Sequence, residues 1–340
     1  MRIVTRLAGL LAAGVAFVAA SPLCAQSVAD FYRGKTLHMV IGYTPGGGYD
    51  LYGRIAAEFL GRHIPGNPLI LPQNMPGNSS LRAVDYLIQV APKDGTYLGS
   101  VQQALAMTAL TDDKNRFDVS KLHYLGRLTS NIDIAVALSR TGIKSFADAQ
   151  QREVVLGADQ AGSMATAFAL TLNKYAGAKF RIVKGYGGSN EIQLAAERGE
   201  VEVNGSYSLP AVLVSHPDWV RDGAATILYQ NALARFAQMP QVPTVLELVN
   251  GEEGKALARV IAGTAEVGRS ILTPDAPAER IAALRAAFQE MLKDPDFIAA
   301  CQTRRLMLDP ARGEDMDAIN RETMNLPKPF VAALKGLLKE

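Results

Sequence analysis

Three consecutive glycines, Gly46 to Gly48, lie in a loop between an apolar segment at 36–41 and a predicted helix that begins near Asp50. Because glycine has no Cβ, the backbone N–H groups of such a loop can approach a ligand closely. The first turn of the helix adds N–H donors without partners inside the helix and a partial positive charge. This combination is typical of an anion site. The alternative interpretation is structural, with the glycines shaping a tight turn and Asp50 capping the helix.

The spacing of these glycines argues against a nucleotide ligand. A dinucleotide-binding loop has the pattern G-x-G-x-x-G, but counting from Gly46 the third glycine position holds Leu51. No Gly-Lys-Ser/Thr follows to form a phosphate-binding loop. The anion predicted here is therefore not a nucleotide.

Residue types that carry catalysis are present, but their spacing does not form an active-site motif. No G-x-S-x-G motif surrounds Ser163, Ser189 or Ser206. The four histidines include no i, i+4 pair, and Cys301 has no partner at metal-ligand spacing, so we expect neither a metal nor a cofactor. His38 is interpreted as a strand residue. We predict a protein that is not an enzyme, with an exported hydrolase or isomerase acting on a small acid as the alternative.

The first loop is one of four similar segments, each rich in Gly, Ser or Asn and each placed between a predicted strand and a predicted helix. They occupy 42–49, 72–80, 157–163 and 184–190, two in each half of the chain. In open α/β sheets such loops gather at the carboxyl ends of the strands. Two α/β lobes built in this way present facing rims, so we expect a ligand cleft between them.

At 340 residues the chain is long enough for two domains. We place a crossing between lobes near Asn131, so residues 26–130 and 251–340 form lobe 1 and residues 131–250 form lobe 2. The segment Val242–Val245 is interpreted as the return crossing. After Pro277 a helix with a buried apolar stripe is expected to pack on lobe 1. A double connection of this kind provides a hinge between the lobes.

Residues 1–25 have the features of a secretory signal peptide. Arg2 and Arg6 precede the apolar run 7–20, and small residues follow up to Ala25. We expect cleavage near Ala25 and export to the periplasm. The run is too short for a comfortable membrane span, and no later stretch reaches 18 uninterrupted apolar residues, so we expect no membrane-spanning segment.

Removal of the signal changes the cysteine count and the charge. The alternative, a lipid on Cys24, is disfavoured because the bulky Leu23 precedes it. Cys301 is then the only cysteine of the mature protein, which excludes an internal disulfide. Loss of Arg2 and Arg6 lowers the basic residues from 35 to 33, equal to the 33 acidic ones, so the formal charge falls from +2 to 0. Nothing in this balance indicates a nucleic-acid partner.

Several short motifs, in a fixed order behind the export signal, give the mature chain a family resemblance over nearly its full length. The chain resembles the extracytoplasmic solute receptors of tripartite tricarboxylate transporters, also called Bug-type or TctC-type receptors. The motifs are Pro45-Gly46-Gly47 with Asp50, Asn74-Met75-Pro76-Gly77, Pro92-Lys93-Asp94-Gly95-Thr96, Ala161-Gly162-Ser163, Gly199-Glu200-Val201-Glu202, Val242-Pro243-Thr244, and Thr273-Pro274 before the late helix.

The resemblance implies a two-lobed type II periplasmic-binding fold, each lobe a mixed sheet flanked by helices, with a hinge between the lobes. It further implies a monomer that closes on a small carboxylate and delivers it to the membrane permease subunits of a tripartite transporter. In such receptors backbone N–H groups, small polar side chains and water hold the carboxylate. The matching positions are Tyr43, Gly47, Gly48, Asp50, Asn74, Gly77, Gly162, Ser163, Gly187, Gly188 and Ser189. Tyr49, Asn78 and Ser206 complete the predicted ligand-binding set.

Three loops depart from the family pattern at positions expected to touch the distal part of a ligand. Lys184-Gly185-Tyr186 stands where many members have Tyr-Lys-Gly, and Asp159-Gln160 stands where small residues are usual. Asn78-Ser79-Ser80 replaces a plainer glycine-rich run. The ligand is therefore predicted only by class, as a mono- or dicarboxylate of C4 to C8 or an aromatic acid. A role as the ligand-sensing partner of a sensor kinase needs the same closure, so it stays open beside transport.

Overall fold

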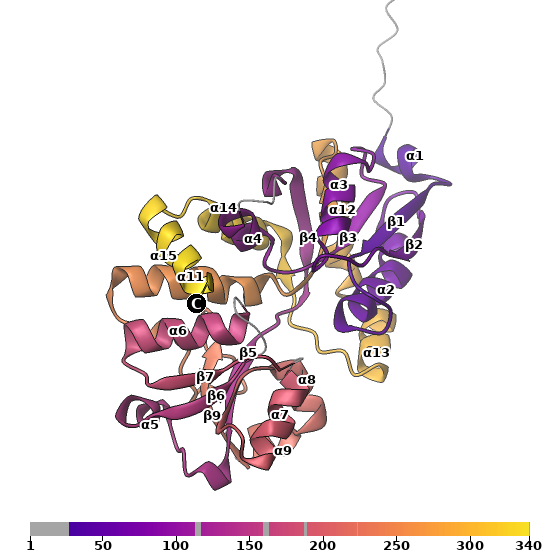
Figure 1. Ribbon diagram of the computed structural model, residues 1–340. Coiled ribbons are helices and arrows are strands. Elements are labelled where there is room, and N and C mark those ends of the chain that lie inside the picture. Colours follow the sequence, from indigo (N-terminus) through magenta and orange to yellow (C-terminus); the bar gives the residue numbers. More distant parts are fainter. Residues whose placement is uncertain (1–26, 113–116, 159–162, 187–188, 223, 340) are drawn as a thin grey trace, which may run out of the picture.

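The computed structural model describes residues 27–112, 117–158, 163–186, 189–222 and 224–339, and in this part of the chain the strands form two separate mixed sheets (Figure 1). The first sheet has the order β11-β4-β10-β3-β1-β2. Its strands are β1 (Thr36–Ile41), β2 (Leu69–Asn74), β3 (Tyr97–Ser100), β4 (Leu122–Thr129), β10 (Arg269–Pro274) and β11 (Ala311–Arg312). The second sheet has the order β7-β6-β8-β5-β9. Its strands are β5 (Asp133–Leu138), β6 (Val154–Gly157), β7 (Phe180–Val183), β8 (Val203–Ser208) and β9 (Ala225–Asn231).

Strand β1 is apolar nearly throughout because helices cover both faces of the first sheet. Leu37, Met39 and Ile41 are buried in the core on one face, and Val40 is buried in the core on the other. The helices of the first face are α2 (Gly48–Leu60), α12 (Ala278–Met291) and α13 (Pro295–Thr303), with α1 (Val28–Tyr32) against α12. Those of the second face are α3 (Leu81–Gln89), α4 (Leu105–Thr111) and α14 (Gly313–Met324).

The late helix confirms its prediction. Pro277 is the N-cap residue of α12, and the stripe Ile281, Leu284, Phe288 and Met291 is buried against the first sheet. Proline suits this position because its fixed φ leads into the helix and its missing N–H would have no partner inside the helix.

The second sheet is also covered on both faces. One face carries α5 (Phe146–Gln151), α6 (Met164–Ala176), α10 (Val245–Leu248), α11 (Gly251–Val267) and α15 (Lys328–Lys339). The other carries α7 (Ser189–Arg198), α8 (Leu209–Ser215) and α9 (Pro217–Arg221). Short 3₁₀ turns lie at η1 (Gly61–His63), η2 (Val119–Lys121) and η3 (Ser139–Thr141). Figure 1 shows α15 and α11 beside α6, so the end of the chain packs on helices of the second sheet.

The chain passes from the first sheet to the second between β4 and β5, at residues 130–132, and returns at Gly268, between α11 and β10. The predicted return crossing at Val242–Val245 is wrong. Gln230 N donates to Pro243 O at 2.9 Å, and the Thr244 side chain caps α10 in a capping box with Glu247, so this segment stays beside β9. The Thr-x-x-Glu pattern was the signal for a helix start there. The division into lobes at 130/131 and 250/251 stays a prediction.

Candidate functional site

A cavity of about 480 Å³ lies between segments that belong to the two sheets. The side of the first sheet contributes the loop after β1, the turn before α3 and the segment from the end of β3 into α4. The side of the second sheet contributes the starts of β5, α6 and α7 and the end of β8. The lining residues are Tyr43, Tyr49, Ser79, Gln102, Gln103, Ala104, Met107, Thr108, Asp133, Ser163, Met164, Ala165, Ser189, Ile192, Ser206, Ser208 and Thr264.

Two stacked tyrosines form one wall of this cavity. The rings of Tyr43 and Tyr49 lie 4.4 Å apart at 5°, and the Arg269 guanidinium lies 3.9 Å from the centre of the Tyr49 ring. The Tyr49 hydroxyl accepts from Gln103 N at 3.0 Å. Burial raises the pKa of the Tyr43 hydroxyl far above its usual value, so it stays protonated at neutral pH. The wall therefore presents two stacked phenol groups, of which that of Tyr43 is neutral.

Asp50 does not cap the helix, so the capping interpretation is wrong. Helix α2 begins two residues earlier at Gly48, with Gly47 as its N-cap, and Asp50 is its third residue. The Asp50 carboxylate is 2% exposed and accepts hydrogen bonds from Gly46 N at 2.9 Å, Arg54 Nε at 2.9 Å and Asn74 Nδ2 at 2.7 Å. The glycines allow this arrangement because Gly46 has φ +88°, which brings its N–H back over the helix start.

The network around Asp50 also fixes the second loop. Asn74 donates to Tyr43 O at 2.9 Å and accepts from Arg54 Nη2 at 2.6 Å, so its amide joins the two loops to each other. Beyond it, Asn78, Ser79 and Ser80 all adopt positive φ (47°, 49° and 71°) before α3 begins. Ser80 is buried and accepts from Gln102 N at 2.9 Å, which leaves Ser79 on the cavity wall.

The opposite wall consists mainly of hydroxyl groups. Ser163 is the N-cap of α6 and accepts from Thr166 N at 3.3 Å. Ser189 opens α7 and donates to Ser206 O at 2.7 Å, and Ser206 in turn donates to Asp133 Oδ2 at 2.7 Å. Ser163, Ser189 and Ser206 come from three different elements and line one cavity, as small polar groups around an anion would.

The structure places the predicted residues in three groups. Tyr43, Tyr49, Ser163, Ser189 and Ser206 line the cavity. Gly47, Asp50, Asn74, Gly77 and Asn78 lie in or beside the first two loops and are not among the lining residues, and Gly48 lies on a neighbouring cavity of about 770 Å³ that shares Ser208 with the first. Gly162, Gly187 and Gly188 lie outside the described residues. Direct contact of any of them with a ligand stays a prediction.

Several lining residues were missed by sequence reasoning. Gln102 and Gln103 follow β3 at the same sheet edge as the first two loops, so the strand-exit argument could have included them. Asp133 begins a central strand and Thr264 lies inside α11. Only the sheet order and the packing of α11 bring these two to the cavity, and neither can be read from local spacing.

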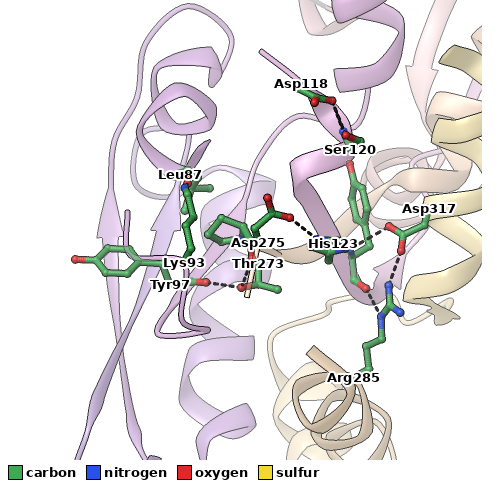
Figure 2. A network of polar contacts seen from close by, with 12 residues as sticks. Leu87, Lys93, Tyr97, Asp118, Ser120, His123, Thr273, Asp275, Arg285 and Asp317 are labelled. Carbon is green, nitrogen blue, oxygen red and sulfur yellow. Dashed lines mark hydrogen bonds and ion pairs between the residues drawn. The ribbon is translucent and has the colours of Figure 1, made fainter. Parts of the chain in front are cut away.

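A second cavity, of about 430 Å³, lies apart from the first, between η2 and α14. Figure 2 shows its polar surroundings, in which His123 Nε2 is 2.8 Å from Asp275 Oδ1 and Arg285 is paired with Asp317. The Ser120 hydroxyl donates to Asp118 at 2.6 Å instead of to His123, so these residues do not form a Ser-His-Asp triad. In the described part of the chain no group of three His, Cys, Asp or Glu residues is placed to hold a metal ion.

Comparison with known proteins identifies the family. A UPF0065 protein from the gbd 5′ region of Cupriavidus necator is 30% identical over 250 residues, which cover 70% of this chain and 72% of the relative. The chain belongs to the UPF0065, or Bug, family of solute-binding proteins. Solved proteins of the same fold include a TctC solute-binding protein and the periplasmic binding protein BugD. No family model matches the chain.

Solved structures show that the Bug-family chain has the type II periplasmic-binding fold. A TctC solute-binding protein from Polaromonas superposes with a TM-score of 0.69 at 19% identity, covering 90% of this chain and 98% of that one. MatC from Rhodopseudomonas palustris with bound malate gives 0.58 at 16%, covering 90% and 99%. An R. palustris protein with adipate gives 0.57 at 18%, covering 89% and 98%. Among the described residues no helix is both long and apolar enough to cross a bilayer.

Proposed function

We propose that this Bug-family protein captures a small carboxylate in the 480 Å³ cavity between the two sheets. The observation that carries the proposal is the composition of the cavity wall. Hydroxyl groups of Ser163, Ser189 and Ser206 and the phenol groups of Tyr43 and Tyr49 line one space of a size suited to a small organic acid. Because Ser189 and Ser206 donate their hydroxyl hydrogens to Ser206 O and Asp133, the hydroxyls that can turn to hold a carboxylate without a salt bridge are those of Ser163 and the two tyrosines.

The start of α6 supports the same ligand class. Ser163 caps this helix of 13 residues, and the partial positive charge of a helix N-terminus favours an anion beside it. Two proteins of the same fold, solved with malate and with adipate, bind acids of the expected size. We propose a ligand between C4 and C8 or an aromatic acid.

The remaining parts of the function follow from the export signal and from the fold. We propose that cleavage near Ala25 releases the protein into the periplasm, where it binds its ligand as a monomer and delivers it to permease subunits of a tripartite tricarboxylate transporter. Two connections between strands of the two sheets, at residues 130–132 and at Gly268, and a third crossing between α14 and α15, would let the walls close on the ligand.

A melting screen tests the proposal. The exported protein is heated in the presence of single mono- and dicarboxylates of C4 to C8 and aromatic acids, and any ligand retained during purification is identified by mass spectrometry. A ligand that binds only the folded protein adds about 2.7 kcal/mol at a hundred times its Kd, which raises the melting temperature by several degrees. The absence of any shift across the panel, with no retained acid, would contradict carboxylate binding.

A further inference from the structure

One acidic residue distinguishes the cavity from a general anion site. Asp133 lines it, whereas no lysine, arginine or histidine is among the described lining residues. Arg269 lies behind the Tyr49 ring and borders the neighbouring cavity instead. An anion entering this space therefore meets a carboxylate, and two like charges at short range repel each other in a partly desolvated site.

Asp133 is held in a fixed position by the sheet. It begins β5, the strand between β8 and β9, and its Oδ2 accepts the Ser206 hydroxyl at 2.7 Å. The Ser206 carbonyl is in turn the acceptor for Ser189, whose own carbonyl accepts Asn204 Nδ2 at 3.0 Å. A carboxylate has about four acceptor positions, so a donor on a ligand can join the bonds that Asp133 already makes.

A buried amide without hydrogen-bond partners lies beside Asp133 in the sheet. Asn231 on β9 is the direct cross-strand neighbour of Asp133, and Ser208 is its neighbour on β8, so the three side chains stand on one face of the sheet. Asn231 is only 1% exposed, yet neither its Nδ2 nor its Oδ1 has a hydrogen-bond partner. A buried amide without partners is costly, and because Asn231 does not line the cavity, it would reach a ligand group through a bridging water.

We infer that Asp133, with Asn231 beside it, selects a carboxylate that also carries a hydrogen-bond donor, an ammonium or a hydroxyl group. The ligand's carboxylate would lie toward Ser163 and the start of α6, and its donor toward Asp133. An acid without such a donor would leave the Asp133 carboxylate facing another acceptor, which is how a polar site rejects an analogue. This inference rests on the proposed function and narrows its ligand class.

The test uses sets of acids that differ only in the donor. Calorimetric titrations compare succinate with malate and aspartate, glutarate with 2-hydroxyglutarate and glutamate, and butyrate with 2-hydroxybutyrate and 2-aminobutyrate. In the set whose acids bind most tightly, we expect the donor-bearing acid to have an affinity about 10- to 150-fold higher than its plain analogue. This ratio corresponds to the free energy of one hydrogen bond to a charged group. The hydroxyl and ammonium acids of each set show which donor the site takes.

Two variants assign the preference to this corner of the cavity. Asp133→Asn should reduce the preference for the donor-bearing acid to within about threefold of its plain analogue. Its matched control is Asp94→Asn, because Asp94 likewise accepts a neighbouring hydroxyl, Thr96 Oγ1 at 2.6 Å, but does not line the cavity. Asn231→Leu has a similar volume and removes only unpaired polar atoms, so it should leave the melting temperature unchanged or higher and weaken binding of the donor-bearing acid.

The outcomes separate the two proposals. If plain and donor-bearing acids bind equally tightly to the natural protein, or if Asp133→Asn leaves the preference unchanged, carboxylate binding stands and the selection by Asp133 is wrong. If no acid of any set or of the wider panel binds, the proposed function itself is contradicted, and the inference with it. A preference that is lost equally in Asp94→Asn would also contradict a specific role for Asp133.

Discussion

At the residue scale, the side chains nearest the glycine loop have structural partners that organise the cavity wall. Asp50 joins Gly46, Arg54 and Asn74 into one network, and Asn74 carries that network to the second loop. The sequence was compatible with an anion site at the loop and with a helix cap at Asp50. In the structure Asp50 instead links the first two loops through its hydrogen bonds. Its partners could not be predicted from spacing because Asn74 is 24 residues away and reaches Asp50 only through the pairing of β1 with β2.

The first prediction concerns the charge of Asp50. Burial alone would raise the pKa of its carboxyl, but hydrogen bonds from Arg54, Asn74 and Gly46 outweigh burial and hold the pKa below its usual value. A lowered folded pKa adds stability above about pH 4, and this stability is lost as the pH falls through the folded value. We expect Asp50→Asn to lower the free energy of unfolding by about 1–3 kcal/mol at pH 7 and by much less at pH 3.

Urea unfolding at both pH values measures this difference. Asp85→Asn is the control, since Asp85 is exposed on α3 and its loss should change stability by less than about 0.5 kcal/mol. An equal loss for Asp50→Asn at pH 7 and pH 3 would show that the ionised network is not what stabilises the loop.

The second prediction separates capping from binding at Ser163, which caps α6 and lines the cavity. Ser163→Ala should lower stability by about 0.5–2 kcal/mol and weaken carboxylate binding by about 10- to 150-fold. Ser145→Ala is the matched control because Ser145 caps α5 outside the cavity lining. Titration of both folded variants decides the question: affinity unchanged in Ser163→Ala would leave it a capping role only.

At the element scale, local pattern was enough to place most strands and the helices that follow the loops. The strand predicted before the loop at 184–190 is β7, which ends at Val183, and the helix predicted after the loop at 157–163 is α6. Strand β2 continues to Asn74, three residues into the loop predicted at 72–80, and Pro72 is tolerated there because β2 lies at the edge of the sheet. The packing of α15 on α6 depends on contacts between distant segments, which local pattern does not contain.

The third prediction concerns the second connection between the sheets. Gly268 has φ +50°, and a Cβ there would lie 2.3 Å from Thr129 O, in the segment that leads into the first connection. Gly268→Ala should therefore lower the free energy of unfolding by about 2–4 kcal/mol, from backbone strain and from this clash.

Gly177→Ala is the control for backbone strain alone. Gly177 also has a positive φ, +68°, but a Cβ there would meet nothing within 4 Å, so its cost should be about 1 kcal/mol. Denaturant unfolding of both variants provides the comparison. Equal losses at the two positions would show that the two connections are not as tightly packed as the structure indicates.

At the scale of the whole molecule, the repeated order of strand, polar loop and helix was sufficient to predict two α/β lobes with facing loops, and the family resemblance added that each sheet is mixed. The family membership and the type II fold agree with this predicted two-lobed architecture. The individual cavity residues were harder to predict, because the same repetition places every loop near the cavity without deciding which side chains turn toward it. Asp133 illustrates this limit, since it lies outside all four predicted loops.

The measurement that tests the central claim most directly is calorimetric titration of the best carboxylate into three proteins. Thr108 lines the cavity between the sheets, so Thr108→Phe should fill part of it and abolish or weaken binding by at least about tenfold. Asn325 lines the separate cavity beside α14, so Asn325→Phe should bind as the natural protein does. If Thr108→Phe binds normally while Asn325→Phe does not, the carboxylate site is not the cavity between the two sheets.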